Sequence, residues 1–377
     1  MFWCSLCPRR ARFSAAKLRD CAVTSRSVSE HAQVSEHDHR GRVFAVFAVL
    51  AAACLFGTTG IAQALGPAGT TPLGVGSARI VIGGLGLMAV LPWLGATRRG
   101  AVSLWKTPWG IAAGLMTTMY QVCFFGALLQ TGVALGTLVT IGTGPILGGL
   151  LSWLVLKDRP TLGWVVATAI CLVGLVLLIG AGIEVSHISA LGFVLSFMAS
   201  AGYALYTIGA KHMINSGHSS DEVMASAFGL GAVISVPILL SQPLGWLTTP
   251  RGLAMVLWLG LAATTVAYVL FGRGLRHLSA GPVTTLVLAE PVIATILSVV
   301  ILGEHLLPIE WAGAALVLIG LALQGFVSTR RNPHASSSTQ SILRATLIVR
   351  IPRVGSRLIF DRGSPVSLVD PTQVSRL

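Results

Sequence analysis

The chain has 377 residues, of which 54% are hydrophobic and 10% are charged, and its mean hydropathy is +0.79. Soluble globular proteins carry about 25% charged residues, so a soluble chain of this composition would lack the polar surface needed to cover itself. The composition therefore excludes an ordinary soluble domain and indicates an integral membrane protein. The formal net charge of +13 would suit nucleic-acid binding only if the basic residues formed one folded face. They lie instead in tails and in short gaps between apolar runs.

The first segment, residues 1–42, is polar and of mixed charge, and the first long apolar run begins at Val43. A secretory signal would place a short apolar run and a cleavage site near residue ~20–30, which this segment does not. We expect a disordered cytoplasmic tail. A Cys-x-x-Cys pair at Cys4 and Cys7 has histidines only far downstream, whereas zinc sites need a compact second ligand pair. No metal site and no cofactor are predicted.

Ten apolar segments follow. Each is close to the ~20 residues with which a helix crosses a ~30 Å hydrocarbon core at ~1.5 Å per residue. We predict membrane-spanning helices at residues 43–65, 72–94, 108–129, 133–156, 162–181, 190–210, 223–240, 253–270, 283–302 and 308–327. Residues 329–377 are rich in Ser, Arg and Pro and are expected to form a second disordered tail.

The basic residues fall in alternate gaps between these segments. If the N-terminus is cytoplasmic, the outside loops hold only Arg251. The inside loops and the C-terminal flank hold Arg98, Arg99, Lys106, Lys157, Arg159, Lys211, Arg273, Arg276, Arg330 and Arg331. This placement follows the positive-inside rule and predicts that both termini are cytoplasmic.

An internal repeat appears when the chain is displaced by 146 residues. Identical pairs at this offset include Pro145 with Pro291, Phe125–Gly126 with Phe271–Gly272, and Ser152 with Ser298. Any two apolar helices share Leu, Ala and Gly by composition. Shared Pro, Phe-Gly and Ser at one offset across three consecutive helices are harder to obtain in that way.

The offset maps the third to fifth helices onto the eighth to tenth, so the repeat unit is five helices. Because five is odd, the second unit enters the membrane from the opposite side, as in many secondary transporters. We therefore predict an all-α integral membrane fold of two inverted five-helix repeats, at residues 43–182 and 189–328.

Two stretches resemble a known family. The sequence LVLAEPVIATILSVVILGEHLLPIEWAGAALVLIGLAL (Leu286–Leu323) resembles the second-repeat signature of EamA-type transporters in the drug/metabolite transporter superfamily. The sequence TGPILGGLLSWLVLKDRPTLGWVVATAICLVGLVLL (Thr143–Leu178) is similar to its first-repeat counterpart, and Arg79 matches a recurrent arginine. The resemblance covers roughly residues 43–328 and is specific for the superfamily but not for a substrate.

This resemblance implies a ten-helix bundle in a bacterial cytoplasmic membrane that moves small metabolites such as amino acids or amines, often by proton exchange. The chain departs from the family pattern at two places. Gly144 stands where the second repeat has Glu290, and Phe56-Gly57 replaces the usual Trp-Gly of the first helix. These departures leave the coupling mechanism open.

Glu290 is the main candidate site residue because it stands alone in an apolar helix. It lies about nine residues, or ~13 Å, from the predicted cytoplasmic end. A carboxylate there costs a few kcal/mol on insertion scales. It must face a polar cavity, pair with a cation or hold a proton. We predict that Glu290 binds a substrate amine or cycles a proton as solvent access alternates. The alternative is that it only stabilises a helix break at Pro291.

Arg79 is predicted to be a countercharge, either to Glu290 or to an anionic substrate group. The alternative is an arginine that extends to the membrane interface. Pro145 and Pro291 are predicted helix breaks at equivalent places in the two halves, which would point to the binding site, and a simple packing kink is the alternative.

Other polar residues at mid-helix could line the same cavity: Thr118, Tyr120, Gln121, Tyr203, Tyr206, Thr264 and Tyr268. A threonine often bonds back to its own helix, whereas an amide needs several partners, so Gln121 is the stronger candidate.

The sequence thus predicts a secondary transporter, most simply an exporter, that works by alternating access and is driven by a gradient. No catalytic residues are predicted. The rivals are a non-transporting membrane scaffold and an integral-membrane enzyme acting on lipid-linked substrates. The expected partners are a small-molecule substrate and the bilayer, with proton coupling and a homodimer left open and no nucleic acid.

Overall fold

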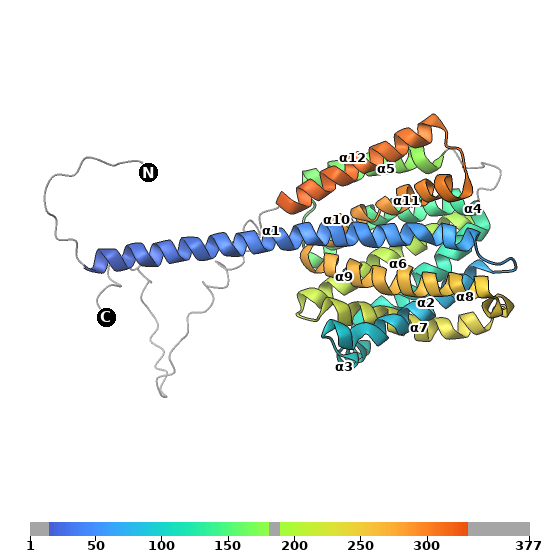
Figure 1. The fold of residues 1–377 in the computed structure, drawn as a ribbon, viewed down its shortest axis with the longest axis horizontal. Helices are drawn as coiled ribbons and strands as arrows, with labels where there is room; N and C mark the ends of the chain where they lie inside the picture. The colour runs from blue at the N-terminus through green and yellow to red at the C-terminus, as the bar shows by residue number, and fades with distance from the viewer. Residues whose placement is uncertain (1–14, 181–188, 331–377) are drawn as a thin grey trace, which may run out of the picture. The chain divides into compact units, whose positions relative to one another are not determined.

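A computed structural model of the chain describes residues 15–180 and 189–330, with side chains from residue 39. All the regular structure in these ranges is helical (Figure 1). The α-helices are α1 (Ala15–Ala64), α2 (Pro72–Val90), α3 (Arg98–Ser103), α4 (Pro108–Leu156), α5 (Leu162–Gly180), α6 (Ala190–Asn215), α7 (Ser220–Leu240), α8 (Pro250–Leu257), α9 (Ala267–His277), α10 (Ala280–Leu286), α11 (Ala289–Leu297) and α12 (Pro308–Arg330). The remaining turns are the 3₁₀ helices η1 (Leu91–Leu94), η2 (Leu104–Lys106) and η4 (Gly245–Thr248) and the π-helices η5 (Trp258–Val266) and η6 (Ser298–Leu302).

Within the described ranges, nine helices are long and apolar enough to cross a membrane, where the sequence predicted ten. The difference lies in α4, which joins the predicted third and fourth spans into 49 residues. That is about 73 Å of rise, more than twice a ~30 Å core. Gly132 inside α4 has φ 76° and ψ 170°, which interrupts the helical path there. Helix α4 therefore consists of two segments, each long enough to cross.

Helix α1 begins at Ala15, within the segment that was expected to be a disordered tail. Its membrane-length part is His39–Ala64, close to the predicted first span. No proline interrupts the chain between residues 15 and 64, so the helix can continue out of the span. For residues 15–42 the prediction of disorder therefore differs from the structure. Residues 1–14 and 331–377 lie outside the described residues.

Each major contact between two helices has a counterpart between the two equivalent helices of the other half. Helix α1 packs against α9 and α11, and correspondingly α6 packs against both segments of α4. Helix α2 packs against α7, and α5 lies along α12 (Figure 1). In each of these last two pairs, the two helices are the equivalent helices of the two halves. This pattern is expected of two related five-helix units.

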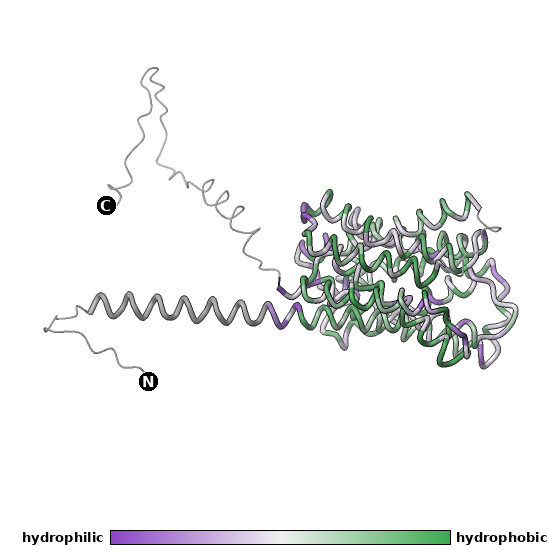
Figure 2. The backbone as a smooth tube through the Cα atoms, turned by 90° about the horizontal axis from the view of Figure 1, so that it is seen from above, coloured by the Kyte–Doolittle hydropathy of each residue, from purple (hydrophilic) through white to green (hydrophobic). Residues whose placement is uncertain are grey.

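Hydrophobic residues line the length of the bundle and hydrophilic ones gather at its ends (Figure 2). Contacts between loops show which helix ends meet: His39 Nδ1 lies 3.2 Å from the Thr329 carbonyl oxygen, and Lys211 Nζ donates to Leu275 O over 2.7 Å. Thr97 donates to Glu222 at the same end. We call this end the basic end, because it holds every Lys and Arg of residues 39–330 except Arg79 and Arg251.

Candidate functional site

Arg79 lies inside the bundle and is 8% exposed. Its Nε donates a hydrogen bond of 3.1 Å to Thr264 Oγ1. Thr264 in turn donates to the carbonyl oxygen of Leu259, five residues earlier, over 2.8 Å. Both residues lie in the π-helix η5, a type of turn that is frequent at functional sites. Arg79 and Thr264, which were predicted separately as site residues, thus lie together, and the Arg79 side chain is buried within the bundle.

Glu290 follows a break in the ninth span. Helix α10 ends at Leu286 and α11 starts at Ala289. Pro291 has no N–H with which to reach the Val287 carbonyl oxygen, and the N–H of Glu290 bonds it instead over 2.9 Å. The carbonyl oxygen of Glu290 lies against Gly57 of α1, where an added Cβ would approach it to 2.9 Å. Glycine thus allows α1 to pack at the broken turn.

The Glu290 carboxylate has no hydrogen-bond or ion-pair partner among the described residues. It interacts electrostatically with Arg79, the one other ionised group nearby in the core. Arg79 itself uses only Nε within the described structure, so the two terminal nitrogens of its guanidinium group remain available. The core of the bundle therefore contains a carboxylate and a guanidinium group that are near one another but do not form an ion pair.

All four tyrosines of the chain gather around this pair of charges. The ring centroids of Tyr120 and Tyr203 are 6.0 Å apart, those of Tyr203 and Tyr206 5.4 Å, and those of Tyr206 and Tyr268 6.3 Å. The Tyr206 hydroxyl donates to the Tyr268 hydroxyl over 3.2 Å. Glu290 interacts electrostatically with Tyr120, Tyr203 and Tyr268. Four residues predicted separately from the sequence thus form one cluster, which we call the tyrosine cluster.

Two phenylalanines complete the base of the tyrosine cluster. The Phe228 ring centroid lies 3.8 Å from that of Tyr268, and that of Phe56 lies 5.0 Å away. Sequence analysis noted Phe56 only as a departure from the family pattern and missed Phe228. A phenylalanine in an apolar helix does not stand out in the sequence as a candidate site residue.

Gln121 is 3% exposed, and neither its amide nitrogen nor its amide oxygen has a partner in the described structure. Its Nε2 lies beside Gly76, one helical turn before Arg79 on α2. Thr118, one turn before Gln121, donates instead to the carbonyl oxygens of Gly114 and Gly231, both over 3.3 Å. Thr118 therefore connects helices within the fold, and Gln121 retains unused hydrogen-bonding groups.

Pro145 does not break its helix, contrary to the prediction. Helix α4 runs through Pro145, and the interruption falls at Gly132. Proline removes one hydrogen bond, but a long helix can absorb that loss as a bend. Its neighbour Gly144 lies against the ring of Tyr203, with an added Cβ at 3.4 Å from the ring. Of the two predicted break points, the described chain is interrupted only next to Pro291.

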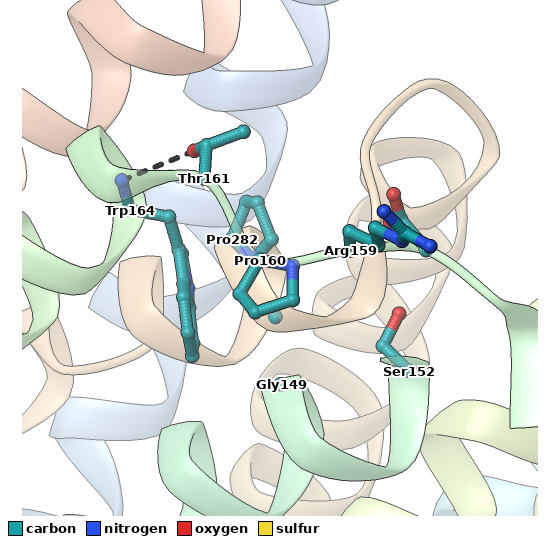
Figure 3. A pocket seen from close by; sticks show the side chains of 9 residues that line it. Gly149, Ser152, Arg159, Pro160, Thr161, Trp164 and Pro282 are labelled. Carbon is teal, nitrogen blue, oxygen red and sulfur yellow. Dashed lines mark hydrogen bonds between the residues drawn. The ribbon is translucent and has the colours of Figure 1, made fainter. Parts of the chain in front are cut away.

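Two cavities lie at the ends of the bundle. The first is at the basic end and has a volume of about 20 Å³, room for one water. Its wall includes Ser152, Pro160, Trp164 and Pro282 (Figure 3). Ser152 Oγ is buried there without a partner, and Trp164 Nε1 donates to Thr285 Oγ1 over 3.1 Å. Trp164 thus connects the two halves at this end.

The second cavity is a largely apolar groove of about 440 Å³ at the opposite end. Its lining comes from α1, α8, η5, α11 and η6 and includes Thr58, Arg251, Trp258 and Leu297. Trp258 Nε1 donates to Thr58 Oγ1 over 2.9 Å across it. Thr58 in its wall follows Gly57, which lies against the backbone oxygen of Glu290.

Comparison with known proteins adds the family. A model described as the EamA-like transporter family matches residues 43–180 and 190–326. The uncharacterized transporter YwfM of Bacillus subtilis (strain 168) is 39% identical over 282 residues, which cover 75% of this chain and 93% of YwfM. The threonine/homoserine exporter RhtA of Escherichia coli (strain K12) is 29% identical over 275 residues, which cover 70% and 85%.

A further relative, from Streptantibioticus cattleyicolor, is named a probable terminal-alkyne amino-acid exporter. It is 24% identical over 265 residues, which cover 70% of this chain and 87% of that protein. A solved crystal structure has the same fold, with a TM-score of 0.64 at 21% identity, and covers 76% of this chain and 98% of that one. Because the family matches span both halves of the bundle, the chain belongs to the EamA-like transporter family.

Proposed function

We propose that the chain is a secondary exporter of small amino-acid-type metabolites, which works by alternating access around Glu290 and Arg79. The observation that supports this most directly is the unpaired Glu290 carboxylate in the core beside Arg79. A zwitterionic amino acid offers the two complementary groups, an ammonium for Glu290 and a carboxylate for Arg79. RhtA is named a threonine/homoserine exporter and the Streptantibioticus relative a probable terminal-alkyne amino-acid exporter, which supports the same substrate class.

The energetic reason concerns the Glu290 carboxylate. An ionised carboxylate in a low-dielectric interior is costly unless a cation or a proton neutralises it. Arg79 is already held by Thr264 through Nε, and its terminal nitrogens can bind a carboxylate in the two-pronged geometry that arginine favours. A substrate ammonium would therefore compete with a proton for Glu290. Competition of this kind couples export to the entry of a proton.

We propose that the basic end faces the cytoplasm, because Lys and Arg accumulate on that side of membrane proteins. Both ends of the described bundle, at His39 and Thr329, then lie on the cytoplasmic side. In this orientation the groove near Trp258 lies at the outer end of the bundle, and the bond from Trp164 to Thr285 joins the two halves at the cytoplasmic end.

The first experiment measures export from cells that overproduce the protein, against amino acids, amines and toxic analogues. We expect resistance or export with the native chain, and a loss of at least about tenfold with Glu290→Gln, because one charged contact is worth that much or more. The matched control is Glu310→Gln at the start of α12, whose carboxylate accepts only from the N–H of Leu307.

Transport that survives Glu290→Gln would move the coupling site elsewhere. If Glu310→Gln abolished export as fully as Glu290→Gln, the effect would not be specific to the core. If no compound were exported by the native chain, transport itself would be in doubt and the scaffold alternative would gain.

A further inference from the structure

We infer that the tyrosine cluster and Glu290 form a cage for a substituted ammonium group, and that the protein also exports quaternary amines such as trimethylated amino acids. This inference rests on the proposed function, because it describes the amine end of the same site. It extends the substrate class from primary amines to nitrogen atoms that carry a fixed positive charge and no N–H group.

The first argument is the depth at which the tyrosines lie. Tyrosine in membrane proteins is enriched at the two interfaces, where its hydroxyl meets water. Here every tyrosine of the chain lies far from the helix ends. Tyr203, for example, is 13 residues beyond Ala190 and 12 before Asn215. Interface anchoring therefore cannot explain these residues, and a role in the core must.

The second argument is the arrangement of the rings. Successive rings are tilted by 47° between Tyr120 and Tyr203, 79° between Tyr203 and Tyr206, and 64° between Tyr206 and Tyr268. Edge-to-face contacts of this kind are common between packed aromatic rings, and they turn the ring faces in different directions. A cation within about 6 Å of several ring faces is attracted by each of them. Recognition of quaternary ammonium by aromatic cages uses this arrangement.

The third argument is that the cage has a closed base and an open side. Tyr206 and Tyr268 are buried and joined by their hydroxyls, with Phe228 packed on Tyr268. Tyr120, Tyr203 and Glu290 are only partly buried, although they lie midway along their helices. We therefore place the ammonium group on the side of the cluster formed by these three partly exposed residues.

The fourth argument is chemical. A trimethylated nitrogen cannot donate a hydrogen bond, so it gains nothing from acceptors arranged for a primary ammonium. Ring faces and a carboxylate attract it by charge alone. The tyrosine cluster supplies the faces, and Glu290, which acts electrostatically on three of the four tyrosines, supplies the charge. Arg79 would bind the carboxylate of a trimethylated amino acid as it would that of threonine.

The test uses the full-length protein in liposomes with two labelled probes, trimethylglycine and threonine. We expect the native chain to transport both. Tyr203→Phe keeps the ring face and should retain trimethylglycine transport within about twofold. Tyr203→Leu removes the face and should lower it at least about tenfold, the range of a desolvated cation–π contact. Tyr120→Phe and Tyr120→Leu repeat the comparison on another helix, in case one leucine variant does not fold.

The outcomes separate this inference from the proposed function. If threonine is transported and trimethylglycine is not, the cage is wrong and amino-acid export stands. The cage is also wrong if the phenylalanine and leucine variants lose trimethylglycine transport equally, because the ring face then contributes nothing. If neither probe is transported, the proposed function fails and the cage falls with it. Elution volume and melting temperature in detergent show that each variant is folded.

Discussion

At the scale of single residues, Arg79 and Glu290 differ in how they are held. The Nε of Arg79 is fixed by Thr264, whereas the Glu290 carboxylate has no partner among the described residues. A fixed guanidinium and a free carboxylate suit different tasks. The first can orient a substrate carboxylate, and the second can exchange one cation for another. Under the proposed function, Thr264 is a positioning residue that acts through Arg79.

We expect Thr264→Val to weaken transport of carboxylate-bearing substrates by raising KM about tenfold, because Arg79 loses the acceptor that orients it. A buried donor left without a partner costs about 1–3 kcal/mol, so the melting temperature should also fall. Thr264→Ser keeps the hydroxyl and should restore both. Transport assays in liposomes and thermal unfolding in detergent measure the two effects.

The internal repeat supplies the control for this experiment. Thr118 occupies the equivalent place in the first half, but it bonds backbone carbonyl oxygens of Gly114 and Gly231 and not a guanidinium group. Thr118→Val should therefore leave KM nearly unchanged. Equal changes in KM for the Thr118 and Thr264 variants would show that Thr264 has no special role toward Arg79.

At the scale of elements, the breaks in helices are set by different residues. In α4 the break falls at Gly132, whose φ of 76° and ψ of 170° lie in a region open almost only to glycine. In the ninth span the break precedes Pro291, which lacks an N–H. Proline at 145 is absorbed by its helix. The residue type alone thus does not fix the position of a break.

We expect Gly132→Ala to lower the free energy of unfolding by about 1–3 kcal/mol, the cost of a strained backbone conformation. No atom lies within 4 Å of an added Cβ at Gly132, so the effect comes from the backbone and not from a clash. Gly60→Ala is the matched control, since Gly60 also has free space but lies within helix α1. Thermal unfolding in detergent that shows equal stability for both variants would refute the strained turn.

The sequence was sufficient for the spans because hydropathy is a local property, and it identified Glu290 because a charge in an apolar helix is conspicuous. It could not show that Tyr120, Tyr203, Tyr206 and Tyr268 meet. These residues lie on three helices far apart in the chain, and which faces meet depends on packing between the halves. Gly132 falls in the gap predicted between residues 129 and 133, but its conformation could not be predicted, because it depends on how the third and fourth spans enter the bundle.

At the scale of the whole molecule, the two ends of the bundle differ in their charged residues. The basic end carries nearly all the Lys and Arg of residues 39–330, and the opposite end carries Arg251 with Glu304 and Glu310. This asymmetry supports the proposed orientation through the positive-inside rule. It does not depend on any feature of the central site.

We expect His305→Cys to be labelled by an impermeant thiol reagent in intact cells, and His218→Cys only after the cells are permeabilised. His305 and His218 are both exposed, and they lie at opposite ends of the bundle. Both variants are made in a chain whose own cysteines are replaced by alanine. The reverse pattern of labelling would place the basic end outside and overturn the proposed direction of transport.

The π-helix η5 sets the angular position of the residues that follow it. Its wider turn accommodates one residue more than an α-helical turn, and each residue of an α-helix advances the side-chain direction by about 100°. Thr264 and Tyr268 therefore owe their directions, toward Arg79 and toward Tyr206, to this added residue. A shortened turn would rotate α9 about its axis, and it would move Thr264 away from Arg79 and Tyr268 away from Tyr206 without altering one side chain of the site.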